Sequence, residues 1–388
     1  MAQTQGRLMT QPFDFDQIVD RHGSDSLKWG IYPPEILPMW VADMDFTSPP
    51  EVLTALHQRI DHGVFGYALA TQKVTDSVVN WLQQRYDWTI DPQWLVWLPG
   101  LVPALHAACL SYTEADQEVV TFSPVYPPFL SAPKTCQRPH RDIPLTRDHG
   151  RYTFDLQRFD DQLTDKSRLL LLCHPHNPVG RAFEKQELTA LAEQCIKHNL
   201  IICSDEIHCD LVLNHTRHIP FACLSEEIAQ RTVTLMSAAK TFNIAGLNCG
   251  FAIIPNPTLR RQFNHAAQGM IPHPNALGYT ATQAAFTQAE PWRQALLEYL
   301  RGNRDYLLKE INQRLPMLTM EPVEATYLAW INVSALEDYR PAFFEQAGLG
   351  FSAGEPFGDN RFMRLNFGCP RSTLEEAMLR LEQAISPR

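Results

Sequence analysis

The middle of this chain alternates short apolar runs with a segment of helical periodicity, and this alternation restricts the possible folds more than any other feature. Five apolar runs have the length of strands: EVVTFSP (118–124), SRLLLLC (167–173), LIICSDE (200–206), TVTLMS (232–237) and CGFAII (249–254). Between the second and third runs, apolar side chains recur at helical spacing, at Leu188, Leu191, Ala192, Cys195 and Ile196. Nearly continuous apolar strands with intervening helices predict an α/β fold with a mainly parallel sheet covered on both faces. Its ligand crevice is expected at the carboxyl ends of the strands.

The last hundred residues do not follow this alternation. The elements expected there are a long amphipathic helix over roughly 286–314, a strand over 326–333 and a C-terminal helix with a capping box, Ser372 with Glu375. We therefore expect a large α/β domain over 46–285 and a smaller α+β domain made of 1–45 and 286–388. A single large α/β domain is the alternative.

Charge and cysteine content restrict the partners and the compartment. The formal net charge is −10, which argues against a general nucleic-acid-binding protein, since such proteins carry basic patches. Nine cysteines are scattered without a CxxC motif and mostly within apolar runs, which is typical of reduced core cysteines in a cytoplasmic protein. Their spacing matches no common zinc pattern, so no metal site is expected. We also expect no membrane span and no signal peptide, because no sufficiently long apolar run occurs.

Several polar side chains stand where an expected strand gives way to a loop. They are Asn177 after the 167–173 run, Asp205 and His208 at the end of the 200–206 run, and Ser237 and Lys240 at the end of the 232–237 run. Taken singly, each has an ordinary structural explanation. Asp205 could cap a helix, and Asn177, which precedes a proline, could simply form a turn.

Two further segments add to this set. Gly100 lies at a turn, and Leu101 and Val102 open an expected helix whose free backbone amides would form a natural phosphate site. Tyr126, in SPVYPPF, offers an aromatic ring, for which packing is the ordinary explanation.

Lys240 is the residue that most needs an explanation. It follows an apolar strand in the sequence SAAKTF, with no acidic neighbour, and burial disfavours the charged form of a lysine. Condensation with an aldehyde would resolve this, because the charge would move to a conjugated iminium. A strand-end lysine, an acid, a turn asparagine, an aromatic residue and a phosphate-binding helix start are together what a pyridoxal phosphate site requires. There the acid keeps the pyridine nitrogen protonated, so that the ring accepts electrons from a carbanion.

The order and spacing of these residues are similar to those of fold-type I, class I/II aminotransferase-like enzymes. The similarity covers nearly the whole chain, from PMWVADMDF (38–46) to RLNFG (364–368). Five segments resemble more narrowly the MalY/PatB-type cystathionine β-lyases, which are cysteine-S-conjugate C–S lyases: PMWVADMDF (38–46), FGYAL (65–69), HNPVGR (176–181), SDEIHCDLV (204–212) and KTFNIAGL (240–247). The histidine in DEIH replaces the tyrosine usual in aspartate aminotransferases. The resemblance implies a PLP-dependent transferase-like large domain, a pyridoxal 5'-phosphate cofactor and a homodimer with shared active sites.

The resemblance also implies roles for individual residues around the cofactor ring. Lys240 would bind the cofactor covalently and then remove the Cα proton of the substrate. Asp205 would pair with the pyridine nitrogen, and Asn177 would bond the phenolic oxygen. His208 would lie near that same oxygen, and Tyr126 would stack on the ring.

Further roles concern the phosphate and the substrate. The amides of Leu101 and Val102, with Ser237, would hold the phosphate, and Tyr67 would reach the phosphate of the neighbouring subunit. Arg364 would bind the α-carboxylate of the substrate, a bidentate interaction that suits a guanidinium.

Two positions depart from the pattern of many fold-type I enzymes, and both concern the phosphate. Ala239 stands where a hydroxyl residue often precedes the lysine, and Asn248 stands where an arginine often follows it. Either another donor compensates or the affinity for the cofactor is modest.

The expected reaction is β-elimination from L-cystathionine or a related S-substituted cysteine, giving a thiol, pyruvate and ammonia. A thiolate suits this departure, since thiols have a pKa near ~8.5. An aminotransferase is the first alternative, because both reactions begin with removal of the Cα proton. A catalytically weak, regulatory PLP-binding protein is the second. An aspartate or glutamate transaminase would need a second cation for the side-chain carboxylate, and no motif clearly supplies one.

Overall fold

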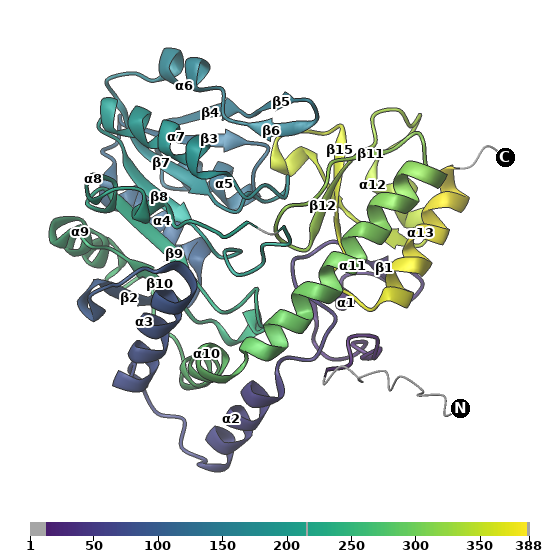
Figure 1. The fold of residues 1–388 in the computed structure, drawn as a ribbon, viewed down its shortest axis with the longest axis horizontal. Coiled ribbons are helices and arrows are strands. Elements are labelled where there is room, and N and C mark those ends of the chain that lie inside the picture. Colours follow the sequence, from purple (N-terminus) through teal and green to yellow (C-terminus); the bar gives the residue numbers. More distant parts are fainter. Residues whose placement is uncertain (1–12, 215, 386–388) are drawn as a thin grey trace, which may run out of the picture.

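The computed structural model describes residues 13–214 and 216–385. The parts of the expected smaller domain at 1–12 and 386–388 lie outside the described residues. A seven-stranded sheet occupies the centre of the larger part of the molecule (Figure 1). In spatial order its strands are β2 (Leu95–Leu98), β10 (Gly250–Ile253), β9 (Thr232–Met236), β8 (Ile201–Asp205), β7 (Ser167–Cys173), β3 (Glu118–Ser123) and β4 (His140–Pro144).

The mainly parallel sheet expected from the sequence is confirmed, with one strand running the other way. Strands β9, β8, β7, β3 and β4 are mutually parallel. The run at 249–254, expected as another parallel strand, forms β10, which is antiparallel to both β9 and β2. A parallel neighbour needs a crossover connection, usually a helix, whereas β9 and β10 are joined by turns and one short 3₁₀ helix, η3 (Ala245–Leu247).

Alternate side chains of the central strands face two separate hydrophobic cores. Leu169 and Leu171 of β7 belong to one core, and Leu170 and Leu172 belong to the other. The first core is completed by α4 (Leu101–Tyr112), α5 (Pro127–Thr135) and α9 (Pro257–Ala267). The second is completed by α6 (Leu156–Gln162), α7 (Lys185–Lys197) and α8 (Glu226–Ala229). Burial on both faces explains why these strands read as continuous apolar runs.

A smaller antiparallel sheet lies beside the large one (Figure 1). In spatial order it contains β11 (Thr319–Met320), β12 (Leu328–Asn332), β15 (Phe362–Asn366) and β14 (Ser352–Ala353). The helices α11 (Glu290–Arg314) and α13 (Arg371–Ile385) pack together next to it. From the N-terminal segment, β1 (Leu37–Pro38) pairs with β13 (Leu349–Gly350). The domain boundaries at 45 and 286 stay a prediction.

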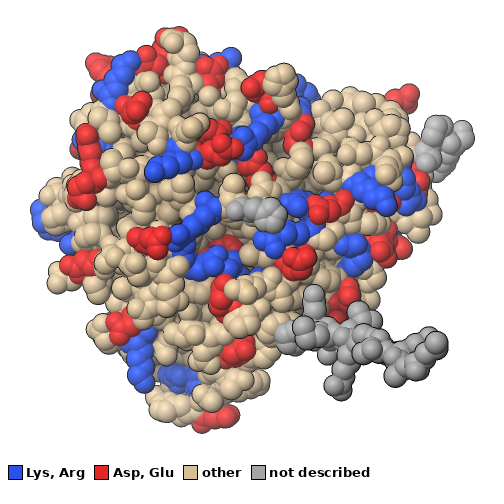
Figure 2. All heavy atoms as spheres, viewed as in Figure 1, with Lys and Arg blue, Asp and Glu red and all other residues tan. Residues whose placement is uncertain are grey.

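The remaining elements connect or flank these sheets. They are α1 (Leu27–Gly30), α2 (Pro50–Asp61), α3 (Gln72–Tyr86), α10 (Ala276–Gln288), α12 (Pro341–Gln346), β5 (Thr146–Asp148), β6 (Arg151–Thr153), η1 (Pro92–Trp94), η2 (Phe221–Cys223) and η4 (Glu355–Phe357). All nine cysteines are free, and only Cys223 is exposed. Of the helices in 13–214 and 216–385, none has both the length and the apolarity that crossing a membrane requires. On the face shown in Figure 2, basic and acidic side chains are interspersed.

Two expectations for the C-terminal part are wrong in detail. The helix expected over 286–314 is two helices, because α10 ends at Gln288 and α11 begins at Glu290. Pro291 lacks the N–H that would continue α10 but fits the first turn of a new helix. The capping box is also wrong: α13 begins at Arg371, so Ser372 lies inside it, and the Pro370 carbonyl accepts hydrogen bonds from its first turn.

Candidate active site

A cavity of about 410 Å³ lies where the carboxyl ends of β7, β8 and β9 meet. Nine of the residues singled out in the sequence line it: Lys240, Asp205, Asn177, His208, Tyr126, Leu101, Val102, Ser237 and Arg364. The strand register explains this, because Asp205, the last residue of β8, is paired with Cys173 on one side and Leu235 on the other. The loops that follow these strands therefore begin at the same edge of the sheet.

Asp205 is a buried carboxylate that faces this cavity. Its side chain accepts a hydrogen bond from the backbone N–H of Ile207 (3.1 Å). Burial raises the pKa of Asp205 to about 7, an effect that Lys240 partly opposes. A cationic group placed against Asp205 would hold it ionised, and a protonated pyridine nitrogen is such a group.

Lys240 reaches the same cavity from the turn after β9. Its Nζ donates a hydrogen bond to the carbonyl oxygen of Ala42 (2.5 Å). Burial lowers the pKa of Lys240 to about 8; Asp43 and Asp205 favour the charged form, and Arg364 disfavours it. The acidic neighbours missing from the local sequence are thus supplied by distant segments.

Arg364, on β15, and Asn177 contact each other on another side of the cavity. The Nη1 of Arg364 donates to Asn177 Oδ1 (3.0 Å), and its Nη2 donates to the carbonyl of Trp40 (3.0 Å). The guanidinium also lies over the ring of Phe357, 4.7 Å from its centroid. Its buried Nε has no partner among the described residues. Although burial lowers the pKa of Arg364 to about 10, it stays cationic at neutral pH and can bind a carboxylate.

His208 and Tyr126 are uncharged at neutral pH. Burial, together with Lys240 and Arg364, lowers the pKa of His208 to about 3, so its ring is neutral. Within the described part of the chain its Nδ1 has no hydrogen-bond partner. Burial raises the pKa of the Tyr126 phenol. Both side chains can therefore serve as neutral hydrogen-bonding or stacking groups.

The expected phosphate end lies at the start of α4. Leu101 opens the helix directly after Gly100, as expected, and the first amides of a helix have no partner within it. The Ser237 hydroxyl donates to the carbonyl of Cys249 (2.6 Å) and accepts from the N–H of Ala239 (3.0 Å). Its proton is thus used within the turn, which leaves the helix amides as the free donors.

Tyr67 is the one predicted site residue that does not line this cavity. Its side chain is fully exposed, at 112% of the reference area. It borders a different surface hollow together with Phe65, Leu69 and Pro274. This position is compatible with the expected contact across a subunit interface, which stays a prediction.

The sequence reasoning missed the part played by the segment PMWVADMDF. Val41 and Ala42 line the cavity, and the Ala42 carbonyl accepts from Lys240 and also from the hydroxyl of Tyr327 (2.9 Å). The segment contributed to the family resemblance, but every residue has a backbone carbonyl, so the residue type does not show which carbonyl contacts Lys240.

The chain matches known proteins over nearly its whole length. The family model for aminotransferase class I and II matches residues 35–381. The cystathionine beta-lyase PatB of Bacillus subtilis (strain 168) is 36% identical over 388 residues, which cover 96% of this chain and 100% of PatB. The crystal structure of OvoB is 46% identical, with a TM-score of 0.94, and the match covers 97% of this chain and 100% of OvoB. The PLP-bound C-S lyase from Staphylococcus hominis is 31% identical, with a TM-score of 0.91 and coverages of 97% and 98%.

These matches agree with the architecture and with the arrangement of the cavity. They confirm the fold-type I, PLP-dependent transferase-like fold. They also confirm the narrower similarity to MalY/PatB-type lyases. The chain therefore belongs to the aminotransferase class I and II family.

Proposed function

We propose that this protein is a PLP-dependent carbon–sulfur β-lyase. It acts on L-cystathionine or a related S-substituted cysteine, consumes one water molecule and releases a thiol, pyruvate and ammonia. The observation that carries this proposal is the full-length similarity to PatB, a cystathionine beta-lyase. The C-S lyase from Staphylococcus hominis, described as PLP-bound, supports it further.

The residues around the cavity fit pyridoxal phosphate. Asp205 offers a buried carboxylate with a raised pKa, which a protonated pyridine nitrogen would compensate. The start of α4 offers backbone amides to the phosphate, and Lys240 offers an amine of lowered pKa to the aldehyde. The bound cofactor supplies an electron sink that stabilises negative charge at the substrate Cα.

Different side chains of this protein bind the substrate, accept its proton and hold the cofactor. Arg364 binds the α-carboxylate of the amino acid and orients the Cα–H bond. Lys240 accepts the Cα proton at its Nζ, since its lowered pKa leaves a useful fraction of free amine near neutral pH. Asn177 and His208 would hold the phenolic oxygen of the cofactor, and Tyr126 would cover its ring. The sulfur then leaves as a thiolate.

We also propose that the protein is a homodimer that shares its active sites. Several large apolar side chains are exposed on the same segment as Tyr67, namely Val64, Phe65 and Leu69, and exposed apolar patches mark interaction surfaces. In such a dimer Tyr67 would reach the phosphate of the neighbouring subunit. Residues 46–285 form the cofactor-binding domain of a cytoplasmic protein, with 1–45 and 286–388 as the smaller domain.

The decisive experiment is pyruvate release from L-cystathionine by the purified, PLP-loaded protein, with no keto acid present. Pyruvate and free thiol in equal amounts are expected. If pyruvate is absent but amino transfer occurs once a keto acid is supplied, the enzyme is an aminotransferase and the lyase proposal is wrong.

A further inference from the structure

A segment of eight residues, 39–46, runs along the cavity and contacts both of the charged groups proposed for catalysis. The carbonyl of Trp40 accepts a hydrogen bond from Arg364 Nη2 (3.0 Å). Two residues later, the carbonyl of Ala42 accepts from Lys240 Nζ (2.5 Å). This segment, called the strap below, therefore connects the proposed carboxylate-binding group with the proposed proton acceptor.

The strap is fastened along its length to β13, to β15 and to the residues just after β15. The amide of Met39 donates to the carbonyl of Gly350 (2.8 Å), and that of Asp45 donates to the carbonyl of Gly368 (2.9 Å). Between them, the side-chain amide of Asn366 donates to the carbonyls of Val41 (2.7 Å) and Asp43 (2.6 Å). Asn366 lies two residues after Arg364, so the strap and the guanidinium share one support.

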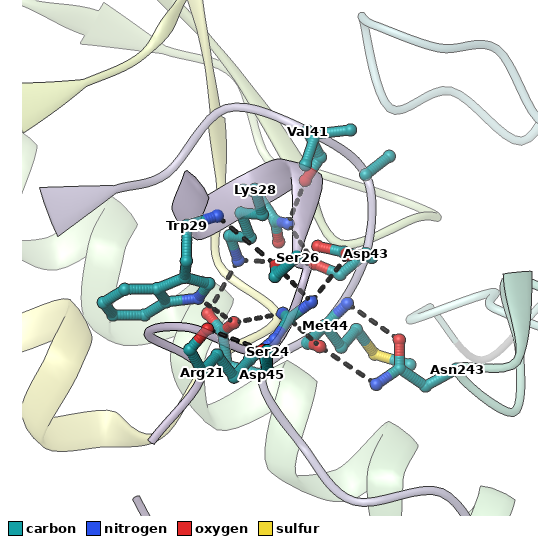
Figure 3. Close-up of polar contacts among 12 residues, drawn as sticks. Arg21, Ser24, Ser26, Lys28, Trp29, Val41, Asp43, Met44, Asp45 and Asn243 are labelled. Carbon is teal, nitrogen blue, oxygen red and sulfur yellow. Dashed lines mark hydrogen bonds and ion pairs between the residues drawn. The ribbon is translucent and has the colours of Figure 1, made fainter. Parts of the chain in front are cut away.

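A group of charges, buried at Asp45 and Lys28 and partly buried at Arg21 and Asp43, holds the end of the strap (Figure 3). Asp45, only 5% exposed, forms ion pairs with the fully buried Lys28 (2.7 Å) and with Arg21 (2.6 Å). Arg21 also pairs with Asp43 (2.9 Å), and the indole N–H of Trp29 donates to Asp45 (2.9 Å). Buried charges are strongly destabilising once they lose their partners, so these contacts restrict residues 43–45 to one arrangement.

Asn243 connects the strap directly to the turn that carries Lys240. Its Oδ1 accepts from the amide of Met44 (3.0 Å), and its Nδ2 donates to the carbonyls of Met44 (2.9 Å) and Phe46 (2.7 Å). Figure 3 shows the side chain facing Met44. Asn243 has a positive φ of 53°, a conformation that asparagine tolerates better than most residues.

We propose that residues 39–46 form a positioning strap. Its carbonyls at Trp40 and Ala42 hold the side chains of Arg364 and Lys240 in fixed positions relative to each other, and Asn243 fixes the Lys240 end of the strap. Asn243 acts only through the strap and is a positioning residue. The kinetic consequence of this inference rests on the proposed function, whereas the contact between strap and lysine does not.

The expected effect on the Lys240 amine follows from its surroundings. Asp43 and Asp205 favour its charged form, while burial and Arg364 disfavour it; the neutral His208 and Tyr327 complete the environment. An accepting carbonyl also favours an ammonium over a free amine. When the Ala42 carbonyl moves away, the pKa of Lys240 should therefore fall, by about one unit.

The test is pH-dependent labelling of Lys240 by a small amine-reactive reagent, read by mass spectrometry on the full-length chain freed of any bound pyridoxal phosphate. Asn243→Gly removes the three side-chain hydrogen bonds and still accommodates the positive φ. The matched control is Asn256→Ala, whose asparagine makes three hydrogen bonds to the backbone of Thr258, Leu259 and Gln230, remote from the cavity. Asn243→Gly should label Lys240 about fivefold faster than wild type at pH 7, and the control should match wild type.

Labelling of a folded Asn243→Gly protein at the wild-type rate would overturn the proposal. If that variant does not fold, Ser48→Ala replaces it, because Ser48 donates a single hydrogen bond to the Asn243 carbonyl (3.0 Å). A smaller acceleration of labelling then supports the strap, and an unchanged labelling rate overturns it.

In the PLP-loaded enzyme, kcat should fall about tenfold in Asn243→Gly with KM little changed, since the Arg364 end of the strap is untouched. Absence of lyase activity in the wild type would refute the proposed function and leave the labelling comparison valid.

Discussion

At the scale of single residues, burial decides the protonation states in the cavity more than neighbouring charges do. It is the largest influence on the pKa values of Asp205, Lys240, His208 and Arg364. Desolvation disfavours every charged form, so it raises the pKa of the acid and lowers the pKa values of the three bases. The cavity is therefore suited to a ligand that brings compensating charges of its own.

One consequence concerns the capture of pyridoxal phosphate by the free amine of Lys240. Because its pKa is about 8, the neutral amine predominates only above that pH. The rate of covalent capture should rise about tenfold per pH unit below pH 8 and level off above it. Stopped-flow absorbance of the cofactor would follow this. A rate that still climbs steeply towards pH 10.5, the ordinary lysine pKa, would contradict the lowered value.

A second prediction concerns Arg364. Arg364→Ala should lower kcat/KM for L-cystathionine by at least about thirtyfold, mainly through a higher KM, because the guanidinium that binds the α-carboxylate is lost. Steady-state pyruvate release measures this. Arg361→Ala is the matched control: it lies three residues away, is exposed, and pairs with Asp359. An Arg364→Ala enzyme with unchanged KM would mean that another group holds the carboxylate.

At the scale of elements, the end of β8 carries two adjacent acids with different surroundings. Asp205 faces the cavity, whereas Glu206 is completely buried. The Glu206 carboxylate accepts from the hydroxyl of Ser204 (2.8 Å) and the amide of Phe221 (3.0 Å), and it contacts His218 Nε2 (2.6 Å). Burial raises the pKa of Glu206 and lowers that of His218. We infer that Glu206 anchors the strand end from which Asp205 projects.

Two substitutions of Glu206 should therefore differ in stability. Glu206→Gln keeps the size and an accepting oxygen, and should lower the free energy of unfolding by less than about 1 kcal/mol. Glu206→Ala leaves a cavity and unpaired donors, and should cost about 3 kcal/mol or more. Urea denaturation provides the comparison. Glu193 is exposed, so Glu193→Ala serves as a control that should change the free energy of unfolding little. Equal losses for Gln and Ala would show that the charge itself is required.

At the scale of the whole molecule, the exposed Tyr67 and the cavity suggest a site completed by a second subunit. Mixing two variants, each inactive alone, tests this arrangement. Lys240→Ala and Tyr67→Ala should each have little activity alone, whereas dimers reassembled from both should recover about a quarter of wild-type activity. Half of the dimers are then mixed, and each mixed dimer carries one intact site of two. No recovery, with exchange verified by mass spectrometry, would show that Tyr67 does not act across subunits.

The sequence determined the main strands and the residues that gather at their ends. A strand buried on both faces must be apolar throughout, so runs such as 167–173 are visible without a structure. Parallel strands place their carboxyl ends at one edge, which is why Asn177, Asp205 and Lys240 could be expected to line one cavity. These properties follow from local composition and chain order.

Only the tertiary structure decided the surroundings of those residues. The direction of β10 is visible only in its pairing with β9 and β2. The contact of Lys240 with Ala42 and the position of Asp43 near that lysine depend on segments far apart in the sequence. The apolar pattern of a strand is the same in either direction, and a backbone carbonyl is common to every residue. Burial and distance, which set the pKa values and the reactivity of the cavity, exist only once the chain is packed.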